Sequence, residues 1–195
     1  FGATSHYEAY AYTTLRDYGS WSVRQYASAV AAETSGGNDG NSFRALAKYI
    51  GVFSEPENTQ RSSVAMTTPV VSEAIAMTTP VVSSSQGSLM KFVLPSQYAK
   101  VEDAPAPTNP SVRLVAIPAR QMAALSFSGH CNSVDEASVK YEELIGLMKD
   151  SGWTPAGQWE LHRHNPPYTI GPFRTNEVLI PVASDTGTTP PVKCE

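Results

Sequence analysis

Two histidines, His162 and His164, are the first side chains to consider, because imidazole binds metals and transfers protons near neutral pH. They are two positions apart, so on an extended strand they would share one face of a sheet. No carboxylate or third ligand accompanies them at a spacing typical of a zinc site. We therefore expect a surface or structural role for this pair rather than a metal site.

Two basic residues, Arg44 and Lys48, are the second candidates, because they lie four positions apart in a segment with helical periodicity. Residues at this spacing are neighbours on a helix surface, where Arg offers a planar fork and Lys a point charge to a pair of carboxylates on a ligand. The alternative is a helix face that is simply solvated.

Methionine recurs in an internal repeat, in which residues 64–72 return eleven positions later as residues 75–83. β-Branched residues dominate both copies, so each copy predicts a short strand with its proline at an edge, bulge or strand end. Met66 and Met77 are polarisable and would pack well against a flat aromatic ligand in a pocket wall. Ordinary core packing is the simpler alternative, since repeated strand segments are mostly buried.

Motifs of catalysis are missing from the sequence. It contains no nucleophile elbow, no glycine-rich phosphate loop and no zinc-hydrolase helix. The acidic pairs Asp135–Glu136 and Glu142–Glu143 fall on the polar side of a predicted helix and indicate surface charge. We therefore expect a protein that is not an enzyme.

The composition predicts one folded domain. Of the 195 residues, 41% are hydrophobic and 16% are charged, as in ordinary globular chains. The net charge of -4, without a cluster of Lys and Arg, argues against a nucleic-acid partner. No apolar run approaches the roughly 20 residues that cross a membrane. Cys131 and Cys194 leave open either a disulfide or two thiols.

The elements that must position these residues are mainly strands, with two helices, which is the α+β class. Ser133 and Glu136 form a capping-box pattern that predicts a helix over 134–150, and apolar periodicity predicts a shorter helix over 41–50. Besides the two repeat copies, alternation and turn signals predict strands at 21–33, 89–94, 112–117, 121–128, 158–163 and 177–182.

Several segments together resemble the successive blocks of the SOUL/haem-binding protein family, in the family's order. The blocks are Trp21-Ser-Val-Arg-Gln-Tyr26, Ile75-Ala-Met-Thr-Thr-Pro-Val, Met90-Lys-Phe-Val-Leu-Pro-Ser, Pro105-Ala-Pro-Thr-Asn-Pro, Pro118-Ala-Arg, Phe127-Ser-Gly, Tyr168 after Asn165-Pro-Pro, and Asn176-Glu-Val-Leu-Ile-Pro-Val. We therefore expect an N-terminal extension over 1–19, a SOUL haem-binding-like domain over 20–183 and a C-terminal tail over 184–195.

The resemblance implies a distorted β-barrel of two pseudo-symmetric halves flanked by two α-helices. It also implies that haem or a related tetrapyrrole binds against the first helix, where Arg44 and Lys48 would meet the propionates. Gln25 stands where some members carry a ligating histidine, so axial ligation is expected to be weak or absent. Glu177 is expected to bond across the barrel seam or to pair with Arg174.

The expected function is reversible binding or carriage of a tetrapyrrole in an apolar pocket. The alternatives are an interaction subunit of an organellar assembly that keeps the fold without a ligand, with a protein as its partner, and a tetrapyrrole-modifying enzyme. The doubled Met-Thr-Thr-Pro block resembles the plant, algal and microbial branches. Because the chain begins at Phe1, we expect either a removed targeting segment, with a chloroplast location, or a fragment, and leave secreted and cytoplasmic locations open.

Overall fold

A single curled antiparallel sheet forms the body of this computed structural model, which describes residues 8–35, 39–52, 54–73, 89–165 and 171–184. Its strands follow the order β2-β3-β9-β12-β11-β6-β7-β4-β8, and β10 pairs with β12 beside this path. In chain order these strands are β2 (Tyr12–Asp17), β3 (Ser22–Tyr26), β4 (Ala29–Thr34), β6 (Val70–Glu73), β7 (Leu89–Val93), β8 (Val112–Ile117), β9 (Arg120–Ser128), β10 (Trp153–Pro155), β11 (Glu160–Arg163) and β12 (Thr175–Ser184).

Short elements complete the fold. Strands β1 (Glu8–Ala9) and β5 (Thr67–Thr68) form a small parallel pair outside the large sheet. Two 3-10 turns, η1 (Val101–Asp103) and η2 (Gly171–Phe173), lie in the connections. Among the described residues, no helix is long and apolar enough to cross a membrane.

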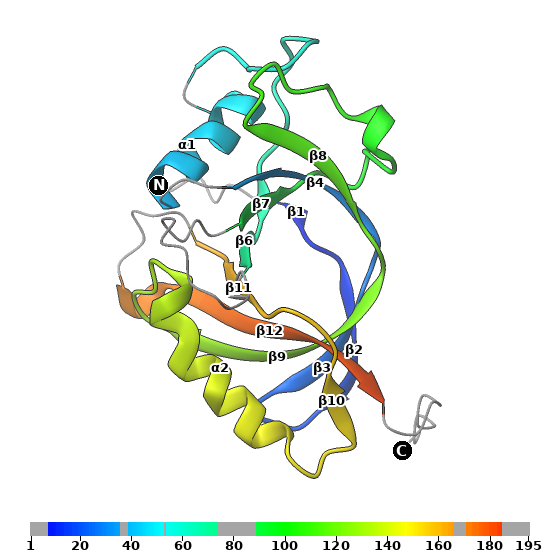
Figure 1. Ribbon diagram of the computed structural model, residues 1–195, viewed down its shortest axis with the longest axis vertical. Helices are drawn as coiled ribbons and strands as arrows, with labels where there is room; N and C mark the ends of the chain where they lie inside the picture. The colour runs from blue at the N-terminus through cyan, green and yellow to red at the C-terminus, as the bar shows by residue number, and fades with distance from the viewer. Residues whose placement is uncertain (1–7, 36–38, 53, 74–88, 166–170, 185–195) are drawn as a thin grey trace, which may run out of the picture.

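Two helices cover one face of the sheet, each over its own half (Figure 1). Helix α1 (Asp39–Ile50) packs on β4, β7 and β8, and helix α2 (Val134–Met148) packs on β9, β11 and β12. Each half therefore consists of one helix against antiparallel strands, and together they form the expected α+β fold of a curled, barrel-like sheet flanked by two helices.

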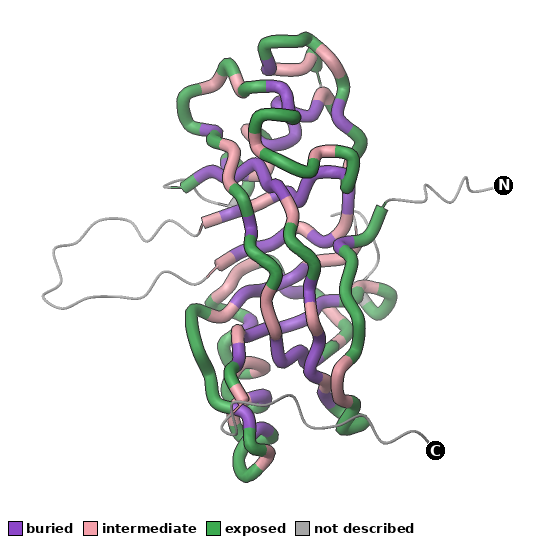
Figure 2. The backbone as a smooth tube through the Cα atoms, turned by 90° about the vertical axis from the view of Figure 1, so that its right-hand side faces the viewer, coloured by how far each residue is buried: buried purple, intermediate pink, exposed green. Residues whose placement is uncertain are grey.

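Strand alternation divides the core between the two faces of the sheet. On β9, Ala123 and Leu125 pack with the α2 core, whereas Met122 and Ala124 belong to a separate cluster on the opposite face, here called the inner face. Figure 2 shows buried stretches crossing the middle of the molecule and exposed ones in the loops at its two ends. The inner face is thus a second packed surface.

The start of α2 follows the predicted capping pattern. The Ser133 hydroxyl accepts a hydrogen bond from the Glu136 amide at 3.2 Å, and the Glu136 carboxylate accepts one from the Asn132 amide at 2.9 Å. The carboxylate thus satisfies the amide just before the cap residue. The apolar stripe buries Ala137, Leu144 and other residues against the sheet.

The expectation of one strand over 21–33 is wrong. The strand is interrupted at Ala27 and Ser28. This separates β3, which pairs with β2 and β9 in one half of the sheet, from β4, which pairs with β7 and β8 in the other half. Strand β2 was not expected: it falls within residues 1–19 and forms an edge of the sheet. Most residues of β2 are exposed, so its sequence shows little of the alternation of apolar and polar residues that predicts a strand.

The first repeat copy forms two short strands rather than one, β5 and β6, with Pro69 between them as its missing N–H donor predicts. The second copy, residues 75–83 with Met77, lies outside the described residues, as does Cys194.

Replacing Leu144 with Ala should lower the free energy of unfolding by about 2–5 kcal/mol, because this side chain is fully buried in the α2 core. Urea unfolding followed by tryptophan fluorescence measures the change. Leu147→Ala is the matched control on the same helix. Leu147 is 38% exposed, so its replacement should lower the free energy of unfolding far less. Equal losses in the two variants would contradict the placement of the apolar face.

Candidate functional site

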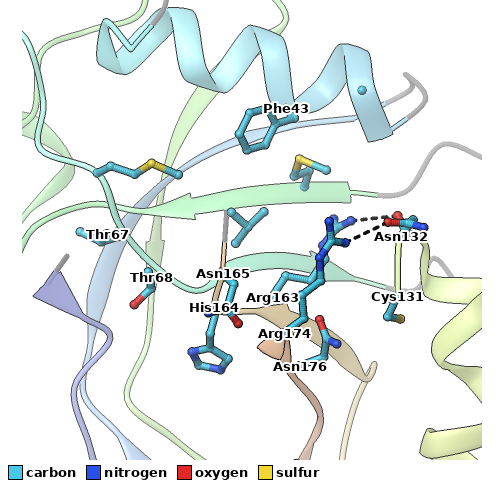
Figure 3. A pocket seen from close by; sticks show the side chains of 14 residues that line it. Phe43, Thr67, Thr68, Cys131, Asn132, Arg163, His164, Asn165, Arg174 and Asn176 are labelled. Carbon is cyan, nitrogen blue, oxygen red and sulfur yellow. Dashed lines mark hydrogen bonds between the residues drawn. The ribbon is translucent and has the colours of Figure 1, made fainter. Parts of the chain in front are cut away.

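A cavity opens on the helix-covered face where the two halves meet (Figure 3). It lies between the start of α1, strands β5 to β7, the end of β11, the start of β12 and the residues that precede α2. Its volume is about 290 Å³, near the lower end of the range for small-molecule sites. The junction stays open because each helix packs on its own half of the sheet.

One wall of the cavity is apolar. It is formed by Phe43 of α1, Val70 of β6, Met90 of β7 and Met66, which precedes β5. Strand alternation directs Met90 and Phe92 to the same face, and the Phe92 ring meets the Phe43 ring edge-on at 5.4 Å between centroids. Thioether and aromatic groups suit contact with a flat apolar ligand.

The opposite end of the cavity is polar and cationic. Arg163, at the end of β11, donates to the Asn132 carbonyl at 2.9 Å and to the Ser72 hydroxyl at 2.6 Å. Arg174, just before β12, donates to the side-chain oxygen of Asn132 at 3.4 Å. Asn176 donates to a backbone carbonyl beside them. None of the fourteen described lining residues is acidic, so this end favours an anionic group.

A hydrogen-bonded network connects the cavity to the inner face of the sheet. His164 lines the cavity, and its Nε2 lies 2.8 Å from the Glu177 carboxylate. Glu177 also pairs with Arg24 at 2.9 Å and accepts from the Ser126 hydroxyl at 2.7 Å. Burial opposes ionisation of Glu177, but these three partners outweigh it and hold the pKa of its carboxyl well below 4.5.

A second network lies deeper on the inner face and does not reach the cavity. His162 and Glu160 are each 1% exposed, with the His162 Nε2 at 2.9 Å from the carboxylate. Arg120 lies 2.8 Å from the same carboxylate. Burial opposes ionisation of Glu160, but His162 and Arg120 lower its pKa to about 2. Burial lowers the pKa of His162, which keeps this imidazole neutral.

The two histidines thus bond different glutamates and have separate surroundings, with ring centroids 6.5 Å apart. Within the described part of the chain, no three His, Cys, Asp or Glu side chains are placed to hold a metal ion. Glu177 pairs with Arg24 of β3 and accepts from Ser126 of β9, whereas Arg174, the alternative partner expected from the sequence, donates to Asn132.

The residues expected to bind the ligand are scattered in the structure. Met66 lines the cavity, whereas Arg44 is exposed on α1 and Lys48 pairs with Glu57 at 3.3 Å. Gln25 lies on β3, where its amide donates to a backbone carbonyl at 3.2 Å. Arg44, Lys48 and Gln25 do not line the cavity, and their contribution to ligand binding stays a prediction.

Sequence reasoning missed the residues at the polar end. Arg163, Arg174 and Asn132 come from three separate segments, and only the pairing of the sheet and the start of α2 bring them together. No local spacing connects them. The Asn132 amide bond to Glu136 is the one local signal, since it belongs to the helix cap.

Comparison with known proteins gives a family and a fold. A family model described as SOUL heme-binding protein matches residues 7–181. No curated protein matches the sequence.

Solved structures of similar shape are distant in sequence. The EcmrR C-terminal domain is 13% identical with a TM-score of 0.56, and the match covers 89% of this chain and 98% of that one. A hydrolase encoded by lin2189 from Listeria innocua is 11% identical with a TM-score of 0.56, over 84% of this chain and 91% of that one. At such identities the likeness shows the shared fold alone.

Lowering the pH should destabilise the protein between about pH 5 and about pH 2, because the carboxyls of Glu160 and Glu177 have depressed pKa values in the folded state. In this window the unfolded chain binds protons that the folded chain does not, so the free energy of unfolding falls as the pH falls. Urea unfolding at a series of pH values measures it.

The Glu177→Gln variant should be less stable at neutral pH by about 3–5 kcal/mol, because it leaves the buried Arg24 charge without its carboxylate. Its stability should also fall less steeply with acid. Glu142→Gln, at an exposed position of α2, should follow the wild type. Parallel curves for Glu177→Gln and the wild type would mean that Glu177 is not ionised in the folded protein.

Proposed function

The chain belongs to the SOUL heme-binding protein family, and we propose that it binds a tetrapyrrole reversibly in the cavity between its two halves. The observation that carries this proposal is the division of the cavity into an apolar, methionine-containing wall and a cationic end without acidic residues among the described lining. A tetrapyrrole with propionates has the matching halves: a flat apolar ring and carboxylates at one edge. A cavity of about 290 Å³ would enclose part of such a ring, which favours exchange over permanent retention.

The surroundings of the histidines support weak axial ligation. His164 is the lining residue with an imidazole, and its Nε2 is already bonded to Glu177. His162 is directed to the inner face, where Glu160 holds its Nε2. Thioether sulfur is available from Met66 and Met90 but is a weaker ligand than imidazole for ferric iron. The apolar wall and the cationic end would then supply most of the affinity.

We further propose binding without chemical turnover. General acid–base catalysis needs a titratable group within reach of the ligand. His164 and Cys131 are the candidates among the described lining residues. The bond of His164 to Glu177 and the contact of the Cys131 thiol with the Ser133 carbonyl at 3.6 Å support structural roles for both. The chloroplast location and a protein partner stay predictions. If the purified protein binds no tetrapyrrole, the alternative hypothesis of an interaction subunit without a ligand takes the place of this proposal.

Titration with protoporphyrin IX should give saturable binding that the substitution Met66→Asp weakens by about tenfold or more. The reason is that a carboxylate in the apolar wall would have to be desolvated against the ring. Fluorescence quenching and the Soret shift measure binding, and circular dichroism confirms that each variant is folded. Ala65→Asp is the matched control at the adjacent exposed position and should bind like the wild type. Equal affinity in both variants would place the ring elsewhere.

Haemin and iron-free protoporphyrin IX should bind with affinities within about tenfold, or ~1.4 kcal/mol, because axial ligation contributes little. Parallel titrations of the wild type measure the ratio. A six-coordinate low-spin haem spectrum that collapses in His164→Ala, but not in the exposed-site control His130→Ala, would make His164 an axial ligand and overturn this expectation.

A further inference from the structure

We infer that Arg163 and Arg174 bind the carboxylates of the tetrapyrrole by exchanging the oxygens of Asn132 for those of the ligand, so that the cavity selects tetrapyrroles with free acid groups. This inference rests on the proposed function and assigns the polar end of the same cavity. It concerns the class of ligand, because esterified and free-acid tetrapyrroles share the ring but differ in these groups.

Asn132 presents two oxygen acceptors to two guanidinium groups. Arg163 donates to its backbone carbonyl at 2.9 Å, and Arg174 donates to its side-chain amide oxygen at 3.4 Å. The two arginines come from the end of β11 and the start of β12, and both extend toward Asn132 in Figure 3. Each guanidinium thus already donates to an oxygen, and carboxylate oxygens of a ligand could accept the same hydrogen bonds.

The exchange is favourable because the acceptors differ in charge. Both Asn132 oxygens are neutral, whereas a carboxylate forms shorter and roughly twice as strong hydrogen bonds to guanidinium. The 3.4 Å contact of Arg174 is also long for such a bond, which makes it the easier of the two to replace.

The position of the two arginines fits the apolar wall. Phe43 on α1 and the arginines line the same cavity, with Phe43 on the α1 side and the arginines toward Asn132 (Figure 3). A flat ring against Phe43 and Met66 would therefore direct its acidic edge to the cationic end. Arg44 and Lys48 are the competing cations, and neither lines the cavity.

The test compares protoporphyrin IX with its dimethyl ester in fluorescence titrations of the full chain. The wild type should bind the free acid about tenfold or more tightly than the ester. The double variant Arg163→Gln/Arg174→Gln should lose this preference through weaker binding of the acid, with the affinity for the ester within about threefold. Lys100→Gln/Lys149→Gln removes the same charge at exposed sites and should keep the preference.

Asn132→Asp is a second variant that does not remove either cation. It places a carboxylate on the side-chain acceptor of Arg174 and leaves the backbone carbonyl that Arg163 contacts unchanged, so it should weaken binding of the acid, leave the ester unaffected and keep the fold. Unchanged binding of the acid in this variant would contradict the exchange at Arg174.

The outcomes separate the inference from the proposed function. Equal affinity of the wild type for acid and ester, or an equal loss of both in the double variant, overturns the inference while tetrapyrrole binding stands. Loss of the preference in Arg44→Gln/Lys48→Gln instead would assign the propionates to α1. If neither porphyrin binds the wild type, the proposed function fails and the inference fails with it.

Discussion

Glu177 forms an ion pair with Arg24 on β3 and hydrogen bonds with Ser126 on β9 and His164 just after β11. These partners belong to neighbouring strands, so one carboxylate on β12 ties together the strands around it on the inner face of the sheet. Removing a partner of a buried pair leaves an uncompensated charge, which costs several kcal/mol. The connection between these strands on the inner face and the orientation of the cavity histidine therefore depend on this one carboxylate.

The inner face of the sheet contains both apolar and charged side chains. Apolar side chains such as Met122 and Leu179 fill part of the inner face, and the Glu160, His162 and Arg120 network occupies another part. Charged groups there are tolerated because they are paired and hydrogen-bonded. The helices cover the opposite face, and each belongs to its own half. The cavity is a consequence of this division, because it forms where the coverage of one helix ends and that of the other begins.

Local sequence rules predict the parts of this structure that are local. The 3.6-residue period and the Ser133 cap place α2 to within two residues of its observed end, and 112–117 is observed as predicted for β8. The break between β3 and β4 was missed because residues 21–33 contain no Gly, Pro, Asn or Asp that would signal a turn, and the need to pass from one half of the sheet to the other is a tertiary constraint.

The site was harder to predict than the fold for a related reason. Spacing along one helix identified Arg44 and Lys48, which share a surface but not the cavity. Met66 was proposed because a polarisable thioether suits a flat ligand, and the structure places it in the cavity lining. The cationic end needs residues from β11, β12 and the loop before α2, whose proximity is set by strand pairing far along the chain.

The family indicates the general class of ligand, whereas the residues that line the cavity bear on the chemical groups that the ligand carries. The family implies the ring, and in our proposal the groups at the ends of β11 and β12 decide which substituents of the ring are accepted. Arg163 and Arg174 lie at or just beyond strand ends, outside the apolar core clusters. Substitutions there can change the charge of the cavity at little cost to packing. The fold can therefore stay constant while the charge of the cavity changes, because the residues of the ion pairs on the inner face of the sheet and the cations that line the cavity are different.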